Sequence, residues 1–254
     1  MHRFFSFVLA LFVVCATNAM ADSSVGRDLP KEVLAQGYIR LSFEDDFSEL
    51  NLDAAVTKRN PWYNALWYQE PNPLDQIYVS KGILALTTPP GTTETSITTV
   101  PRRGPGGATF HHGFFEARMR FANDELDWSA FWLFSRPHSL GIDDNHWCEI
   151  DVFENFGPNL FVGSVHDWTS SSHVRNKNAR QKLPYAVDFS VWHNYGLLWT
   201  PDKLTWFLDS VPVLEATPPQ ICETQEMFMV LGSNKHKDGP LHKLEVDWVR
   251  VLSR

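Results

Sequence analysis

The chain has 254 residues, a formal net charge of −8 and only three cysteines. Because no run of basic residues offsets the acidic excess, nucleic acid and anionic membrane surfaces are poor candidate partners, whereas a neutral polysaccharide would be indifferent to the charge. A chain of this length buries enough surface to fold without a disulfide scaffold.

The N-terminal segment has the pattern of a secretory signal peptide. Residues 1–21 start with basic side chains, continue through an apolar run too short to span a bilayer, and end in the small-x-small sequence Ala19-Met20-Ala21. We therefore expect a secreted protein, extracellular or periplasmic, with residues 22–254 as a single domain. Cys148 and Cys222 remain after cleavage, and their spacing does not tell whether they form a disulfide.

The following segments predict an all-β fold. Residues 29–36 predict one short helix with Asp28 as its N-cap. Short apolar runs of period two then recur between turn-forming Gly, Pro and Asn clusters, as in residues 83–86, 114–120 and 244–251. Many short strands bounded by turns predict an antiparallel two-sheet β-sandwich of the jelly-roll type, without an internal repeat or linker.

Residues 147–154 (WCEIDVFE) predict an unusually acidic strand. Because side chains alternate between the faces of a strand, Trp147, Glu149 and Asp151 share one face. Strict alternation would place Glu154 on the opposite, apolar face, where an ionised carboxylate is costly to bury. One extra residue at position 152 or 153, a β-bulge, would return Glu154 to the face of the other acids.

Three crowded acids on one face suit glycosidic cleavage. Each carboxylate raises the proton affinity of its neighbours, so one acid can hold a proton while another stays anionic. A retaining mechanism needs such a pair about 5–5.5 Å apart. The alternative is a solvated acidic face, and the aromatic residues around these acids argue against it.

The acidic motif resembles the active-site strand of glycoside hydrolase family 16. It has the form Glu149-x-Asp151-x-x-Glu154 after Trp147, and segments 82–86, 113–119, 130–133, 192–199 and 246–251 resemble other family segments in the same order. The resemblance implies a cleft on the concave face of the sandwich. It also implies that Glu149 is the nucleophile, Glu154 the general acid and then base, and Asp151 the residue that orients the pair.

Aromatic side chains on the acidic face are candidate walls for sugar subsites. Trp147 is the strongest candidate, because it lies two residues before Glu149 on the same strand and therefore on the same face. In residues 127–132 we expect Trp128 in the cleft and Trp132 in the core. The resemblance implies that Glu116 binds a sugar hydroxyl, although Arg118, two residues away on the same face, could instead pair with it.

Two further polar residues are predicted near the cleft. We expect His166 on the strand beside the catalytic one, where it either hydrogen-bonds the acids or substrate or has a purely structural role. The resemblance places Asn234 in a region that reaches the cleft, although the neighbouring aromatic residue typical of the family is missing.

We expect no metal or other cofactor in catalysis. His111 and His112 have no further ligands at metal-binding spacing. The resemblance implies a structural calcium held by Asp247, the backbone carbonyl of Gly82 and an oxygen near Asp46. The alternative is that Asp247 simply caps a surface strand.

The function predicted is a retaining endo-glycoside hydrolase that acts as a monomer on a β-1,3- or β-1,3(1,4)-glucan. Three alternatives remain: a red-algal galactan hydrolase (agarase, porphyranase or carrageenase), a transglycosylase, or a non-catalytic carbohydrate-binding protein. Ser129 favours the galactan group, because many laminarinases have proline there. The three acids argue against a binding protein, because such relatives have usually lost catalytic acids.

Overall fold

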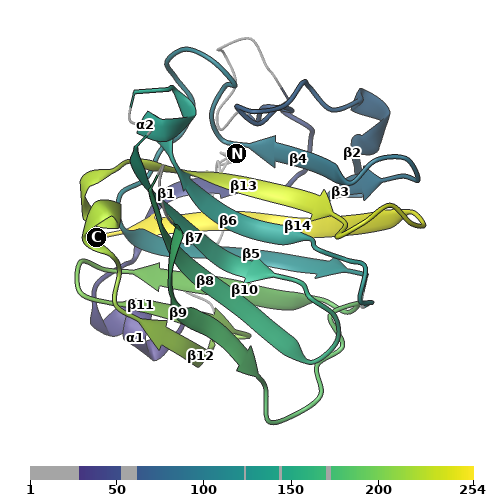
Figure 1. The fold of residues 1–254 in the computed structure, drawn as a ribbon. Helices are drawn as coiled ribbons and strands as arrows, with labels where there is room; N and C mark the ends of the chain where they lie inside the picture. Colours follow the sequence, from purple (N-terminus) through teal and green to yellow (C-terminus); the bar gives the residue numbers. More distant parts are fainter. Residues whose placement is uncertain (1–28, 53–61, 123, 143–144, 170–172) are drawn as a thin grey trace, which may run out of the picture.

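The computed structural model describes residues 29–52, 62–122, 124–142, 145–169 and 173–254. The predicted signal peptide and Asp28 lie outside these residues. Within them, two antiparallel sheets pack face to face (Figure 1). This arrangement confirms the predicted jelly-roll sandwich.

The larger sheet has eight strands. Its order is β12 (Val211–Ala216), β11 (Leu204–Leu208), β10 (His193–Trp199), β5 (Gly113–Phe121), β14 (His242–Ser253), β3 (Ile83–Thr88) and β2 (Ile77–Ser80), with β1 (Arg40–Asp45) also paired to β14. Strands distant in sequence are neighbours here, as when β10 lies beside β5 in antiparallel register from His193↔Met119 to Trp199↔Gly113.

The second sheet has six strands and lies at the front of Figure 1. Its order is β4 (Glu94–Thr98), β13 (Met227–Asn234), β6 (Ala130–Ser135), β7 (His146–Glu154), β8 (Leu160–Thr169) and β9 (His173–Lys182). The predicted acidic strand is β7, and it lies between two partners in the interior of the sheet.

Helices are short in the described part of the chain. They are α1 (Lys31–Ala35), α2 (Arg136–Ser139) and the 3-10 turns η1 (Leu74–Gln76) and η2 (Gln220–Thr224). The predicted first helix is present but begins later than expected, after Pro30, which occupies the N-cap position without a side-chain cap. None of these helices is long and apolar enough to cross a membrane.

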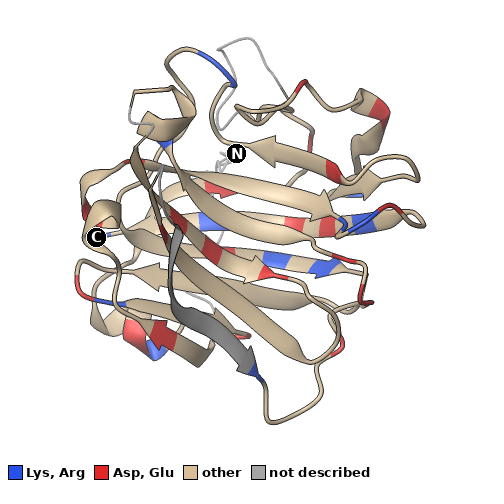
Figure 2. Ribbon diagram, in the orientation of Figure 1, with Lys and Arg blue, Asp and Glu red and all other residues tan. Residues whose placement is uncertain are grey.

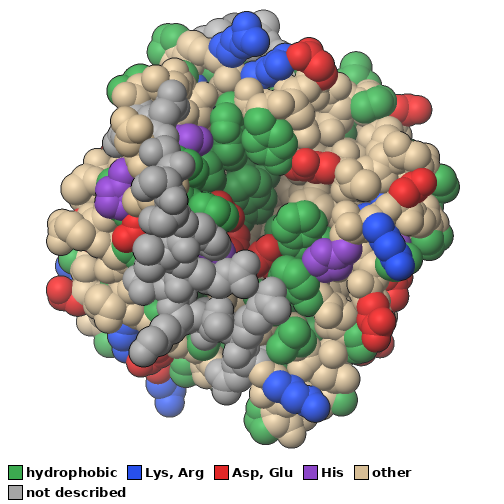
Figure 3. Space-filling view, in the orientation of Figure 1, with side chains coloured by type: hydrophobic (Ala, Val, Ile, Leu, Met, Phe, Trp, Pro, Cys, Tyr) green, Lys and Arg blue, Asp and Glu red, His purple; other side chains and the backbone are tan. Residues whose placement is uncertain are grey.

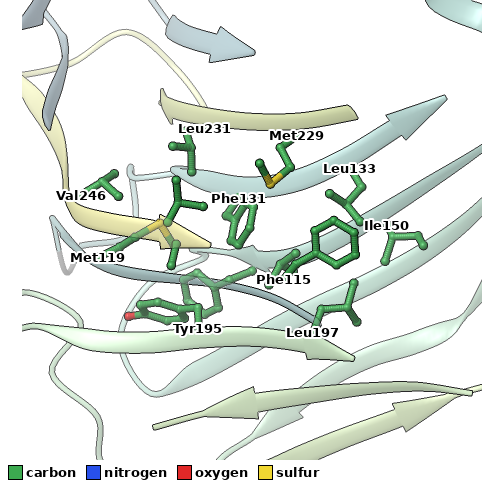
Figure 4. Close-up of a cluster of buried hydrophobic side chains, with 14 of the residues drawn as sticks. Phe115, Met119, Phe131, Leu133, Ile150, Tyr195, Leu197, Met229, Leu231 and Val246 are labelled. Carbon is green, nitrogen blue, oxygen red and sulfur yellow. The ribbon is translucent and has the colours of Figure 1, made fainter. Parts of the chain in front are cut away.

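The hydrophobic core fills the space between the sheets. Alternate residues of each strand point inward, so Phe131 and Ile150 of the front sheet meet Phe115 and Leu197 of the larger sheet (Figure 4). These side chains are fully buried. The opposite face of each front strand is therefore free to form the cleft.

A disulfide joins β7 to η2. Cys148 points into the core from the catalytic strand, and its sulfur is bonded to that of Cys222, with a sequence separation of 74 residues. The structure thereby answers the pairing question that the sequence left open.

Candidate active site

The predicted bulge is present on β7. On β6, Phe131 pairs with Phe153 and the next residue, Trp132, pairs with Asp151, so Val152 is the extra residue. Register with β8 shifts at the same place, between Asp151 and Glu154. Because Val152 and Phe153 are both packed in the core, Glu154 returns to the face of Glu149 and Asp151.

The three acids line a pocket on the outer face of the front sheet. The pocket has a volume of about 190 Å³ and is lined by Tyr68, Thr93, Glu94, Trp128, Ala130, Trp132, Glu149, Asp151, Glu154, Asn234 and Lys235. Figure 2 shows that acidic residues recur along β7 in the middle of this sheet. Figure 3 shows a hollow there, with carboxylates at its floor between hydrophobic side chains.

Each acid has its own hydrogen-bond partner. The indole Nε1 of Trp168 donates to Glu149 Oε2 at 2.8 Å, and that of Trp128 donates to Glu154 Oε1 at 2.7 Å. His166 Nε2 lies 2.9 Å from Asp151 Oδ2. These contacts fix the orientation of all three carboxyls while one oxygen of each outer acid remains for chemistry.

The crowding changes the proton affinity of the site. Burial, followed by the charge of Asp151, raises the pKa of Glu149 to about 8. Ligand atoms of Glu149, Asp151 and His166 lie within 4.8 Å of one another, so the charges interact strongly. The cluster therefore retains a proton near neutral pH, as acid catalysis requires.

The backbone at the bulge is held from the other sheet. Trp206 of β11 reaches across the core, and its Nε1 donates to the carbonyl oxygen of Asp151 at 2.7 Å. Gly163 on β8 makes room for this indole, because a Cβ at that position would overlap the ring. The bond satisfies a buried carbonyl at a place where the bulge disrupts the ladder.

Several predicted residues lie in or beside the cleft. Trp128 and Asn234 line the pocket. His166 is buried and bonded to Asp151, so it belongs to the acid network. Trp147 shares the face of the acids, as predicted, and its ring stacks between His138 and Trp168 beside the residues that line the pocket.

Two predictions are wrong. Trp132 lines the pocket instead of the sandwich core, because it pairs directly with Asp151 and shares its face. Glu116 does not reach the cleft: its neighbours Phe115 and Ala117 point into the core, so it points to the outer face of the larger sheet. There it is 1% exposed and forms an ion pair with Arg250, not with Arg118.

The predicted calcium ligands do not fit a cation as they stand. The carboxylate of Asp247 is ion-paired with the guanidinium of Arg118, and a second cation there would be repelled. Asp46 accepts a hydrogen bond from the backbone amide of Ser48.

The structure also brings Glu223 to His111 and His112, with ligand atoms within 4.8 Å of one another. The two imidazole rings are stacked, with centroids 4.2 Å apart and 24° between their planes. Their in-plane lone pairs therefore run side by side instead of converging. His112 Nε2 lies 2.7 Å from Glu223 Oε2, so a hydrogen bond between these two side chains accounts for the group.

Sequence reasoning missed several residues of the site, among them Trp168, Glu94 and Tyr68. Trp168 could have been found, because it follows His166 by two positions on the same strand and must share its face. Glu94 on β4 and Tyr68, in the segment between β1 and η1, come from distant parts of the chain. They carry no local signal that links them to the acidic strand.

Comparison with known proteins identifies the family. The model for glycosyl hydrolases family 16 matches residues 75–249, which is more than half of the chain. The chain belongs to this family. Structures of family 16 enzymes share the fold: the laminarinase from Flavobacterium sp. UMI-01 superposes with a TM-score of 0.67 at 22% identity, covering 84% of this chain and 100% of that one.

Two similar proteins carry names of enzymes that cleave β-linked glycans. Endo-1,3-1,4-beta-glycanase EglC of Rhizobium meliloti is 26% identical over 262 residues, which cover 89% of this chain and 53% of EglC. Glucan endo-1,3-beta-glucosidase of Cryptopygus antarcticus is 31% identical over 108 residues, covering 40% of this chain and 38% of the relative. The chain thus spans about half the length of EglC and less of the second relative.

Ser129 has a structural role near the site. Its hydroxyl donates to Asp127 Oδ1 at 2.6 Å, and both residues are fully buried. Burial raises the pKa of Asp127 to about 6, so this hydrogen bond helps to hold an otherwise costly carboxyl. Because Ser129 is not among the residues that line the pocket, its presence does not favour a galactan over a glucan.

Proposed function

We propose that this chain is a retaining endo-glycoside hydrolase that cleaves β-1,3- or β-1,3(1,4)-glucan. The observation that carries the proposal is the bulge at Val152, which turns Glu149 and Glu154 toward the same cleft. The name of the similar glucan endo-1,3-beta-glucosidase supports a β-glucan substrate over a red-algal galactan.

The geometry supports a division of roles between the two outer acids. Trp168 holds Oε2 of Glu149, so Oε1 is the oxygen placed to attack the anomeric carbon. Glu154 gives a proton to the departing glycosidic oxygen as that bond breaks. A covalent glycosyl ester forms on Glu149, and water then cleaves it while Glu154 takes the water's proton.

Asp151 and His166 serve the nucleophile indirectly. Asp151 is 2% exposed and bonded to His166, so its carboxylate cannot approach a substrate freely. Its negative charge lies beside Glu149 and raises the pKa of that carboxyl. For the reaction, Glu149 must give up its proton to act as the nucleophile, and Glu154 supplies the proton that the departing oxygen receives.

Aromatic residues provide surfaces for sugar rings. Trp128 is 39% exposed and lines the pocket together with Trp132. Their apolar faces suit the C–H faces of β-linked glucose, and the polar groups between them suit its hydroxyls. This mixture agrees with a neutral polysaccharide as substrate.

Reducing-end release tests the proposal. The mature chain is incubated with laminarin, lichenan, agarose, porphyran and carrageenan, with Glu149→Gln as the blank. We expect release from laminarin or lichenan, and the β-anomer as first product by proton NMR. Cleavage of a galactan alone would overturn the glucan assignment, and an α-anomer as first product would overturn the retaining mechanism.

Secretion is part of the same proposal, because a polymeric glucan substrate would lie outside the cell. It rests on the sequence of residues 1–21, and N-terminal sequencing of exported protein tests it. A mature chain that begins at Asp22 is expected; a chain retained with Met1 intact would contradict it.

A further inference from the structure

A fourth carboxyl lies in the cleft, away from the acidic strand. Glu94 begins β4, at the edge of the front sheet, and lines the same pocket as Glu149 and Glu154. The hydroxyl of Tyr68 donates to it, with distances of 2.9 Å to Oε1 and 3.1 Å to Oε2. The hydroxyl of Ser96 donates to Oε1 at 3.0 Å.

These contacts leave part of the carboxylate unused. A carboxylate can accept about four hydrogen bonds, and among the residues that the structure describes Tyr68 is the one that donates to Oε2 of Glu94. Oε1 is shared between Tyr68 and Ser96, which hold the group in place. Because Glu94 lines the pocket, the remaining acceptor capacity is available to a molecule bound there.

A second acceptor lies beside it. Asn234 of β13 is the direct cross-strand partner of Glu94, and both line the pocket. The Oδ1 atom of Asn234 is buried without a hydrogen-bond partner. A buried acceptor without a donor is costly, so a ligand that brings hydroxyl hydrogens to this place is favoured.

The charge at this end of the cleft is negative. Among the described residues that line the pocket, Lys235 is the one with a basic side chain, and that side chain is fully buried. Its Nζ donates to the carbonyl oxygens of Pro89, Gly239 and Pro240 and lies 3.5 Å from Asp238 Oδ1, so these groups already engage the ammonium. Burial raises the pKa of Glu94, in line with a carboxyl that lacks a nearby cation.

We propose that Glu94, held by Tyr68 and Ser96 beside Asn234, is a specificity residue that accepts hydroxyl hydrogens from an uncharged glucan and rejects anionic polymers. A sugar with free hydroxyls can donate to both side chains at once. A carboxymethyl or sulfate group there has no hydrogen to give and meets a carboxylate of the same charge. The inference rests on the proposed glucanase function and deepens it.

Glu94→Gln tests the inference, because it keeps the shape and removes the charge. kcat and KM are measured on laminarin and on carboxymethylated laminarin. We expect kcat/KM on laminarin to fall about tenfold, mostly through KM, because charge-assisted hydrogen bonds are lost. We expect the ratio of kcat/KM for the carboxymethylated polymer to that for laminarin to rise at least about tenfold.

Two further variants control for charge and for position. Glu215→Gln removes the same charge from the exposed strand β12, where Glu215 pairs with Lys203. It should leave kcat/KM unchanged on both substrates. Tyr68→Phe removes the hydroxyl that holds Glu94 but keeps the carboxylate. It should raise KM for laminarin without raising the ratio of kcat/KM on carboxymethylated laminarin to kcat/KM on laminarin.

The outcomes separate this inference from the proposed function. A wild type that leaves laminarin and lichenan uncut would overturn both. A wild type that cuts laminarin, with a substrate ratio unchanged by Glu94→Gln, would overturn the role of Glu94 alone. A ratio raised equally by Glu215→Gln would do the same, because net charge and not the cleft carboxylate would then be responsible.

Discussion

The bond between Trp206 and the bulge gives the sharpest test of how the fold positions the acids. Trp206→Phe keeps an aromatic ring but removes the indole N–H that donates to the Asp151 carbonyl. Trp206 is completely buried and Asp151 is 2% exposed, so water cannot easily replace the lost donor. The perturbation therefore acts directly on the backbone between Asp151 and Glu154.

The size of the effect follows from two terms. An unsatisfied buried carbonyl costs about 1–3 kcal/mol. The space left by the smaller ring costs about 1–2 kcal/mol more, since core truncations leave cavities. We expect the free energy of unfolding to fall by about 2–5 kcal/mol, the sum of the two terms. We also expect kcat to fall by about tenfold, equivalent to about 1.4 kcal/mol, because Glu154 follows the bulge.

Urea unfolding and initial rates at saturating substrate measure the two effects. Trp199→Phe is the matched control: Trp199 is also fully buried, but its Nε1 donates to the partly exposed carboxylate of Glu223, far along the chain from the bulge. It should lose about 1–2 kcal/mol of stability, from the smaller ring, and keep wild-type kcat. If Trp206→Phe loses no more stability than Trp199→Phe and keeps wild-type kcat, the Trp206 hydrogen bond does not hold the bulge in place.

Three further predictions concern the same strands. The raised pKa of Glu149 means that the native state holds this proton more tightly than the unfolded state, so wild-type stability falls as pH rises from about 5 to about 8. One pKa unit corresponds to about 1.36 kcal/mol, and the carboxyl is partly open to solvent, so the free energy of unfolding of Glu149→Gln should exceed that of wild type by about 2 kcal/mol at pH 8 and by much less at pH 5. Thermal unfolding at both pH values measures this difference, and equal gains at the two pH values would contradict the raised pKa. Replacing both Cys148 and Cys222 by Ala should lower the free energy of unfolding, measured with urea, by about 4 kcal/mol, because the disulfide closes a loop of 74 residues in the unfolded chain. A loss below about 1 kcal/mol would contradict this explanation. Gly163→Ala should lower the melting temperature by several degrees, since its Cβ would overlap the Trp206 indole; an unchanged melting temperature would show that the ring can shift freely.

Residues 147–154 alone predicted the catalytic strand and its bulge. Side-chain parity follows from the geometry of one strand, so the common face of Glu149 and Asp151 and the need for a bulge before Glu154 could be read from eight residues. The cost of burying an ionised carboxylate supplied the reason to expect the bulge, and the register at Val152 confirms it. The alternation of short apolar runs likewise predicted the two-sheet sandwich.

The positions and roles of residues that act through partners on other strands could be found only in the tertiary structure. Parity alone could not reveal that Glu116 faces away from the cleft and pairs with Arg250, which lies 134 positions later in the chain. The same holds for Tyr68 beside Glu94 and for Trp206 at the bulge. The alternation of a strand shows which side chains share a face, but the order of strands in each sheet sets which faces meet. That order depends on contacts between distant segments that no local pattern encodes.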